Sequence, residues 1–234
     1  MIRWENAPGP YEVVFSTREG GVSEGPFASL NLGRATADEP ERVDENRRRL
    51  CAEVGADPGA IAMNYQHHST DVLKARPGAR GDRADGLWTD EDGLPVLALA
   101  ADCLPIALAR ANGAKPALAV LHAGWRGLLG GIVASGVRAL GGGSVAAMVG
   151  PGIGPCCYEV KEEVAAPFRE AFDTDILRGR NLDLWSAAER ALRAAGCAQV
   201  DRVDLCTACT PERFFSHRRD NGLTGRQGVI GLIA

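Results

Sequence analysis

Residues 94–136 decide the fold of this chain, and they read LPVLALAADCLPIALARANGAKPALAVLHAGWRGLLGGIVASG. Three short apolar runs lie inside this stretch, at residues 96–101, 105–109 and 117–121. Each run has the length of a strand and stops at a polar or turn-forming group, which predicts three buried strands. The turn Ala-Gly-Trp-Arg-Gly comes after the third run, and the pattern then predicts a helix over residues 128–140.

Cys103 follows the first of these runs, and His122 follows the third. Side chains just past buried strands can meet at one end of a sheet, where rigid strands and accessible loops together build sites. The chain has only four histidines, at positions 67, 68, 122 and 217, so a histidine-dependent site has few candidates. Cys103 and His122 are therefore candidate functional residues.

A third candidate comes from outside the central stretch. Residues 60–65 predict a short strand that ends at the segment Gln-His-His-Ser. Two imidazoles and one thiolate make a zinc-ligand set that leaves a fourth position for water or substrate. His68, Cys103 and His122 could form such a set, with His67 as an alternative to His68. A metal-free pair of Cys103 as nucleophile and His122 as base is a second interpretation, and an ordinary buried thiol with hydrogen-bonded histidines is a third.

The composition excludes several classes of protein. A length of 234 residues suits one domain, and 45% apolar with 24% charged residues is typical of a soluble globular protein. The net charge of −4 argues against non-specific nucleic-acid binding. No apolar run approaches the roughly 18 residues of a membrane span, and MIRWENAPGP lacks a signal-peptide core. Seven cysteines, an odd number, fit a reducing compartment, so we expect a cytoplasmic protein.

The rest of the chain mixes strands and helices without strict alternation. We expect strands at residues 11–18, 145–149, 200–205 and 229–233. We expect one helix that begins at Pro40, a second over residues 160–172 with Pro167 as a candidate kink or end, and a third over residues 184–195. Residues 20–33 are rich in Gly, Ser and Pro and predict a loop, and residues 74–83 predict an exposed polar segment. This order favours the α+β class, with a sheet covered by helices.

Four further segments leave alternatives open. Residues 122–127 place Arg126 and free N–H groups at a helix start, which suits either an anion site or a plain strand-to-helix turn. Residues 150–155, GPGIGP, favour a tight turn over a phosphate cradle. Cys206 and Cys209 have the C-x-x-C spacing of zinc and redox sites, but without a second such pair we interpret them as ordinary buried thiols. The Arg-dense residues 211–226 are either a solvated basic loop or part of an anion-binding site.

Several long motifs occur in a diagnostic order: FSTREGGVSEGPFASLNLG, NYQHHSTDVL, ADGLWT, LAADCLPIAL, AVLHAGWRG, GPGIGPCCYEV and CTACTPERFFSHRRDNGLTGR. On these motifs the sequence resembles the YfiH family over nearly its whole length. That family has long been labelled "laccase domain" or "multicopper polyphenol oxidase". The resemblance implies a layered α/β/β/α fold of the α+β class, related to the catalytic domain of cytotoxic necrotising factor toxins. It also implies that residues 1–234 form a single domain.

The resemblance further implies one zinc ion, held by His68, Cys103 and His122, which would also be the catalytic residues. It favours His68 over His67 because the usual family motif is Gln-Val-His-Gly, from which this chain departs at His67 and Ser69. The implied reaction is purine nucleoside phosphorolysis, in which adenosine, inosine or methylthioadenosine and phosphate give the free base and a ribose 1-phosphate. Adenosine deamination, and editing of a UDP-muramic acid peptidoglycan precursor, are also attributed to the family.

A physical comparison separates these possibilities. A multicopper oxidase needs many imidazole ligands, and four histidines cannot supply them, so copper is disfavoured. In phosphorolysis Arg126, Arg18 and Asn31 are the candidates for binding phosphate. An amidohydrolase that uses Cys103 and His122, or zinc-bound water, is the first alternative, and a non-catalytic zinc-binding module is the second. We expect a purine nucleoside and phosphate as partners, no nucleic acid or membrane, and a monomer or weak homo-oligomer.

Overall fold

The computed structural model describes residues 1–111, 115–142 and 144–234. Within these residues most strands form two six-stranded sheets. The first sheet has the order β1 (Ile2–Arg3), β2 (Tyr11–Phe15), β14 (Gln227–Ile233), β7 (Val96–Ala100), β3 (Ala62–Tyr65) and β5 (Arg80–Arg83). The second has the order β13 (Cys197–Arg202), β10 (Val145–Val149), β8 (Leu104–Arg110), β9 (Leu118–Ala123), β6 (Gly86–Thr89) and β4 (Val72–Lys74). A separate ribbon pairs β11 (Leu177–Arg178) with β12 (Asn181–Leu182).

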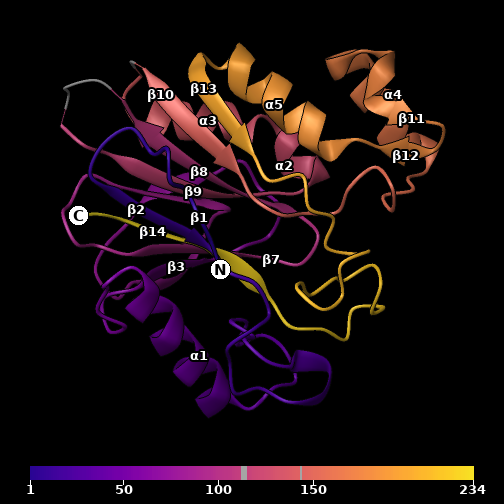
Figure 1. Cartoon of the computed structure of the whole chain (residues 1–234). Helices are drawn as coiled ribbons and strands as arrows, with labels where there is room; N and C mark the ends of the chain where they lie inside the picture. The colour runs from indigo at the N-terminus through magenta and orange to yellow at the C-terminus, as the bar shows by residue number, and fades with distance from the viewer. Residues whose placement is uncertain (112–114, 143) are drawn as a thin grey trace.

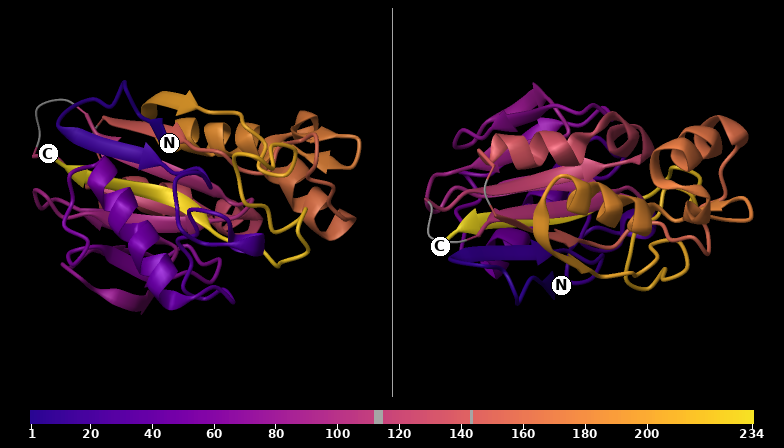
Figure 2. Two further views of the ribbon diagram at one scale, coloured as in Figure 1. Left: turned by 60° about the horizontal axis from the view of Figure 1, so that its bottom comes forward. Right: turned by 90° about the horizontal axis from the view of Figure 1, so that it is seen from above.

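Helices cover the outer faces of both sheets (Figure 1). Helix α1 (Pro40–Glu53) packs on the first sheet. Helices α2 (Trp125–Gly130), α3 (Ile132–Ala139) and α5 (Leu184–Ala194) lie on the second, and α4 (Glu162–Phe172) extends beyond its end with β11 and β12 (Figure 2). Two short 3₁₀ turns are Gly25–Phe27 and Thr174–Ile176. No described helix is both long and apolar enough to span a membrane.

The hydrophobic core has three parts, which correspond to the interfaces between the layers. Leu50 of α1 and Leu97 of β7 belong to the cluster on the outer face of the first sheet. Phe15 and Val120 belong to the cluster between the sheets, and Leu121 belongs to the cluster beneath the helices of the second sheet. Neighbouring residues Val120 and Leu121 face opposite sides because successive strand side chains alternate. Three apolar interfaces separate four layers, which confirms the α/β/β/α prediction.

The central stretch forms the predicted three strands, but its helix differs from the prediction. The expected helix over residues 128–140 begins earlier, at Trp125, and is two helices, α2 and α3. They are divided at Gly131, whose φ of 91° lies in the left-handed region and interrupts a helix. His122 also lies inside β9 rather than past its end, because the strand continues to Ala123.

Other boundaries moved by a few residues. The expected exposed segment at 74–83 contains β5 and the end of β4, whose polar residues pair at the sheet edges. The strand expected at 11–18 ends at Phe15, and the one expected at 200–205 runs from Cys197 to Arg202. Pro167 does not end α4, which continues to Phe172.

Candidate functional site

The two sheets converge on the three candidate ligands. His68 lies in the loop after β3 of the first sheet. Cys103 lies in the turn that leads from β7 of the first sheet to β8 of the second, and His122 lies near the end of β9 of the second sheet. One donor atom of each residue lies within 4.8 Å of the others. The Cys103 Sγ and His68 Nε2 atoms are 3.8 Å apart. Residues that are 35 and 19 positions apart in sequence therefore form one compact group.

His67 is not part of this group. Its ring lies 3.6 Å from the carboxylate of Asp85, measured between Nδ1 and Oδ2. The backbone at His68 has a φ of 63°, a left-handed conformation that is rare for residues other than glycine. This turn places the side chain of His68, rather than that of His67, beside Cys103.

Asp85 organises the group, although it does not contact Cys103. Its carboxylate accepts hydrogen bonds from the backbone amides of His67, His68 and Ser69, and from the Ser69 hydroxyl. The other partner is Nδ1 of His122, 2.8 Å from Oδ1. Burial opposes ionisation of Asp85, but His122 and the Ser69 donors outweigh it and hold its pKa well below the usual range.

The electrostatics favour an ionised thiol at Cys103. Burial raises its pKa, but the imidazoles of His122 and His68 outweigh this effect and lower the pKa to about 6. Burial likewise opposes a charged His122, while Cys103 and Asp85 raise the pKa of His122 to about 9. In the absence of a metal ion, both shifts favour a thiolate beside an imidazolium. A thiolate is also the form in which cysteine binds metals.

Gly124 allows these side chains to approach one another. A Cβ atom at this position would lie 2.8 Å from Cδ2 of His68 and 2.9 Å from Sγ of Cys103. Both distances are shorter than real Cβ contacts allow. Gly124 precedes α2, a helix of six residues. The small residues of the 122–127 segment thus serve close packing at this position.

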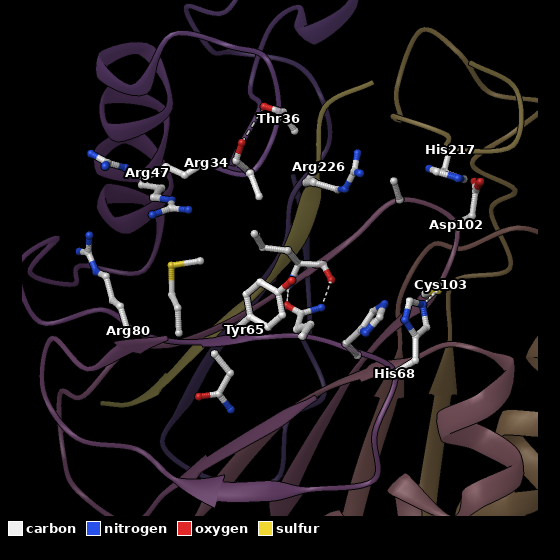
Figure 3. A pocket seen from close by; sticks show the side chains of 18 of the residues that line it. Arg34, Thr36, Arg47, Tyr65, His68, Arg80, Asp102, Cys103, His217 and Arg226 are labelled. Carbon is white, nitrogen blue, oxygen red and sulfur yellow. Dashed lines mark hydrogen bonds between the residues drawn. The ribbon is translucent and has the colours of Figure 1, made fainter. Parts of the chain in front are cut away.

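The group opens into a cavity of about 660 Å³. Five arginines are among its lining residues: Arg34, Arg47, Arg80, Arg218 and Arg226. Figure 3 shows His68 and Cys103 at one end of this cavity and, at the opposite end, beyond Tyr65, a group formed by Arg34, Arg47 and Arg80. The cavity therefore combines a ligand set at one end with positive charge along its walls.

Arg226 lines the cavity, and its pKa is influenced by the charge of Cys103. Burial lowers its pKa, and the negative charges of Asp102 and Cys103 partly offset that effect. Its Nη1 atom donates to the carbonyls of Thr224 and Gly225, 2.9 Å away in both cases. Within the described chain, its Nε and Nη2 atoms donate to no other residue. The N–H groups of these two nitrogen atoms are available to an anionic ligand.

The three residues expected to bind phosphate do not line this cavity. Arg18 donates to the carbonyls of Ala28 and Pro211, at 2.6 and 2.9 Å, and stacks on Phe215. Arg126 is exposed and stacks on Trp125. Asn31 is buried behind the cavity wall, where its side-chain oxygen accepts the amide of Arg226 at 2.8 Å. Arg18 is thus a structural contact, and Asn31 positions Arg226.

Asp102 and Asp85 are the site residues that sequence reasoning did not single out. Asp102 lines the cavity and has a φ of 86°. Its carboxylate accepts the Thr207 hydroxyl at 2.6 Å and the Arg218 amide at 2.7 Å. Both aspartates lie within motifs quoted above, ADGLWT and LAADCLPIAL, and that position was the available signal. Their roles depend on contacts with residues that are distant in sequence.

Comparisons with known proteins identify the family of this chain. A family model described as "Multi-copper polyphenol oxidoreductase laccase" matches residues 12–234. A Pseudomonas aeruginosa protein named purine nucleoside phosphorylase is 38% identical over 230 residues, covering 94% of this chain and 92% of that protein. Escherichia coli purine nucleoside phosphorylase YfiH is 38% identical over 229 residues, covering 93% and 92%.

Solved structures give the same assignment. The crystal structure of YlmD from Geobacillus stearothermophilus superimposes with a TM-score of 0.87 at 33% identity, covering 96% of this chain and 92% of that one. A Neisseria meningitidis protein of the DUF152 family superimposes with a TM-score of 0.88 at 33% identity, covering 97% and 96%. The chain therefore belongs to the YfiH family of laccase-like domains, whose members include proteins named purine nucleoside phosphorylase.

Proposed function

We propose that this chain is a zinc-dependent purine nucleoside phosphorylase that converts adenosine, inosine or methylthioadenosine and phosphate to the free base and a ribose 1-phosphate. The observation that carries the proposal is the opening of the His68, Cys103 and His122 group into an arginine-lined cavity of about 660 Å³. That volume lies within the range of small-molecule sites. The names of the relatives support the same reaction.

The donor set fits zinc. Zinc accepts imidazole nitrogen and thiolate sulfur, with bonds of about 2.0 and 2.3 Å, and tetrahedral geometry then separates such ligand atoms by about 3.6 Å. The observed separation between Cys103 Sγ and His68 Nε2 is 3.8 Å. Asp85 at Nδ1 of His122 is the carboxylate partner that zinc-binding histidines commonly have. Four histidines in the chain are too few for a multicopper centre, so copper remains disfavoured.

His68, Cys103 and His122 would hold the ion, which, when bound, supplies a Lewis acid for an oxygen of phosphate or ribose. Arg226 would bind and orient phosphate through its available N–H donors, since guanidinium groups form strong, directional hydrogen bonds with phosphate. A phosphate oxygen attacks C1′, the bond from C1′ to the purine nitrogen breaks, and the departing nitrogen takes up the proton that hydrogen phosphate loses. Positive charge at Arg226 lowers the barrier by holding the attacking anion close to C1′.

The apolar part of the cavity suits a purine. Met63, Tyr65 and Leu99 are among its lining residues, and Tyr65 lies between the two polar ends (Figure 3). Gln66 also lines the cavity, and its amide is held by two hydrogen bonds with the backbone of Leu99 at 2.6 and 2.8 Å. Aromatic and aliphatic surfaces bind a planar base, while polar groups fix its orientation. A purine beside Tyr65 would leave the ribose between the base and His68.

Two other activities have specific support. The paired pKa shifts, with Cys103 lowered to about 6 and His122 raised to about 9, are those of a cysteine nucleophile and its base. This pair favours an amidohydrolase acting on a nucleotide-linked precursor as the alternative function. The open position beside three ligands also suits adenosine deamination by activated water.

Incubating the purified protein with inosine, with and without phosphate, tests the proposal. We expect hypoxanthine only when phosphate is present, together with an equal amount of ribose 1-phosphate. Replacing inosine by adenosine gives adenine by phosphorolysis and inosine by deamination, so the two products distinguish the two reactions. Hypoxanthine release that does not depend on phosphate, or no release at all, would overturn the phosphorylase proposal.

A further inference from the structure

A second group of potential metal ligands lies outside the His68 site. Cys156 and Cys157 stand between β10 and α4, whereas Cys206 and Cys209 follow β13. One sulfur atom of each lies within 4.8 Å of the other three. We call these residues the four-cysteine group. The interpretation of Cys206 and Cys209 as two ordinary buried thiols is wrong for Cys209, which is exposed, and a second pair of cysteines lies beside them.

The geometry of this group matches a single ion bound by four thiolates. Zinc–sulfur bonds of about 2.3 Å in a tetrahedron place the sulfur atoms about 3.8 Å apart. The separation between Sγ of Cys156 and Sγ of Cys209 is 3.4 Å, and all others lie below 4.8 Å. A four-iron cluster holds its cysteine sulfurs at the corners of a larger cube, so a mononuclear site fits better.

The backbone holds the two halves together without help from a metal. The amide of Thr207 donates to the carbonyl of Gly152 at 3.1 Å, and Gly152 forms a β-bridge with Cys206. The amide of Gly154 donates to the sulfur of Cys206 at 3.3 Å. Such N–H donors stabilise negative charge on a thiolate, and they are typical of the hydrogen bonds that orient metal ligands.

We propose that Cys156, Cys157, Cys206 and Cys209 bind one structural zinc ion, separate from any ion held by His68, Cys103 and His122. Zinc is the chemical class indicated by four thiolates in a tetrahedral arrangement. Four protein ligands leave no open position for water or substrate, which distinguishes a structural site from a catalytic one. Binding deprotonates the thiols, so uptake of the ion releases protons and strengthens at higher pH.

The position of this zinc site connects it to the cavity. The segment that carries Cys156 and Cys157 continues directly to Tyr158, which lines the cavity. The segment that carries Cys206 contributes Thr207, whose hydroxyl binds Asp102. An ion that joins the two segments would fix this wall of the cavity, although no cysteine of the group lines it. We therefore expect loss of the ion to lower stability and to raise KM more than it lowers kcat.

The test counts zinc ions per chain by mass spectrometry after purification with reductant. We expect the paired variant Cys156→Ser with Cys209→Ser to hold one ion fewer than the unaltered protein. We expect His68→Ala with His122→Ala to retain the four-cysteine ion. Cys51→Ala is the matched control, because Cys51 is a buried thiol outside both groups. Equal zinc in the paired cysteine variant and the unaltered protein would overturn the proposal.

Cobalt substitution tests the site without altering the cysteines. It is carried out on the double variant His68→Ala with His122→Ala, or on the unaltered chain if that variant does not fold. Replacing zinc by cobalt should give the intense sulfur-to-cobalt and visible bands of a tetrahedral four-thiolate site. Titration with a mercurial reagent should then abolish these bands and release one ion per chain. The sequence holds seven cysteines. Two fewer free thiols in the denatured, unreduced protein, with no such loss in Cys156→Ser with Cys209→Ser, would mean a disulfide between Cys156 and Cys209, and would contradict the proposal.

Discussion

The carboxylate of Asp85 lies 2.8 Å from Nδ1 of His122 and is fully buried, while four further hydrogen bonds reach it from residues 67–69. One side chain thereby fixes the ring of His122 and the backbone of the turn that presents His68. Two of the three candidate ligands depend on this carboxylate for their orientation. Asp85, which does not line the cavity, therefore holds these two ligands in position.

Replacing Asp85 by Asn should weaken zinc binding at the His68 site about 10–100-fold, because carboxylates that hydrogen-bond to metal-binding histidines typically contribute that much. Competition with a chelator measures the affinity, and phosphorolysis should fall with it. Asp82→Asn, which alters an exposed carboxylate paired with Arg76, is the control and should change neither. Unchanged zinc affinity in Asp85→Asn would show that Asp85 does not orient the ligands for zinc binding.

Gly124→Ala should reduce kcat/KM by about 100-fold or more, since a misplacement of about 1 Å at a catalytic group has that effect. The added Cβ would lie 2.8 Å from the His68 ring and 2.9 Å from the Cys103 sulfur, so both must move. Gly59→Ala adds the same methyl group where the nearest atom is the flexible Asp57 carboxylate at 3.3 Å. Steady-state kinetics of both variants check this, and full activity in Gly124→Ala would show that the ligands need no close approach.

Arg226→Gln should raise KM for phosphate about 10–100-fold with a smaller effect on KM for the nucleoside, because a hydrogen bond to a charged group contributes about 1.5–3 kcal/mol. Arg126→Gln is the matched control, since Arg126 is exposed and stacks on Trp125 outside the cavity lining. Kinetics at varied phosphate and fixed inosine separate the two. An effect on phosphate in Arg126→Gln but not in Arg226→Gln would reverse our assignment.

The free energy of unfolding should fall as the pH rises from about 8.5 towards 11. Burial raises the pKa of Cys51 to about 11, and burial likewise raises that of Cys197 to about 11. The unfolded chain loses protons from both thiols in that range while the folded chain retains them, so the stabilisation is present below pH 8.5 and is lost above it. Urea unfolding at several pH values measures the slope. Cys51→Ala with Cys197→Ala should flatten it, and an unchanged slope would contradict this explanation.

The layers of the fold and the candidate ligands His68, Cys103 and His122 could be predicted from the sequence. The contacts that hold these residues in place could not. The strand at residues 145–149 matches β10 because a fully apolar run between turns is a local signal. The division of α2 from α3 at Gly131 depends on a positive φ that a helical pattern does not reveal. Asp85 and Asp102 act through partners distant in sequence, and so does the pairing of Cys156 with Cys209. Local patterns cannot specify such contacts.

The origin of the oxygen on C1′ of the ribose product distinguishes phosphorolysis from hydrolysis. Inosine is incubated in ordinary water with the protein and with phosphate that carries ¹⁸O at all four oxygens. The mass of the sugar product is then measured by mass spectrometry. We predict ribose 1-phosphate that retains all of the label, because a phosphate oxygen forms the new bond to C1′. Free ribose without ¹⁸O as the sugar product would contradict this prediction and would identify the reaction as hydrolysis.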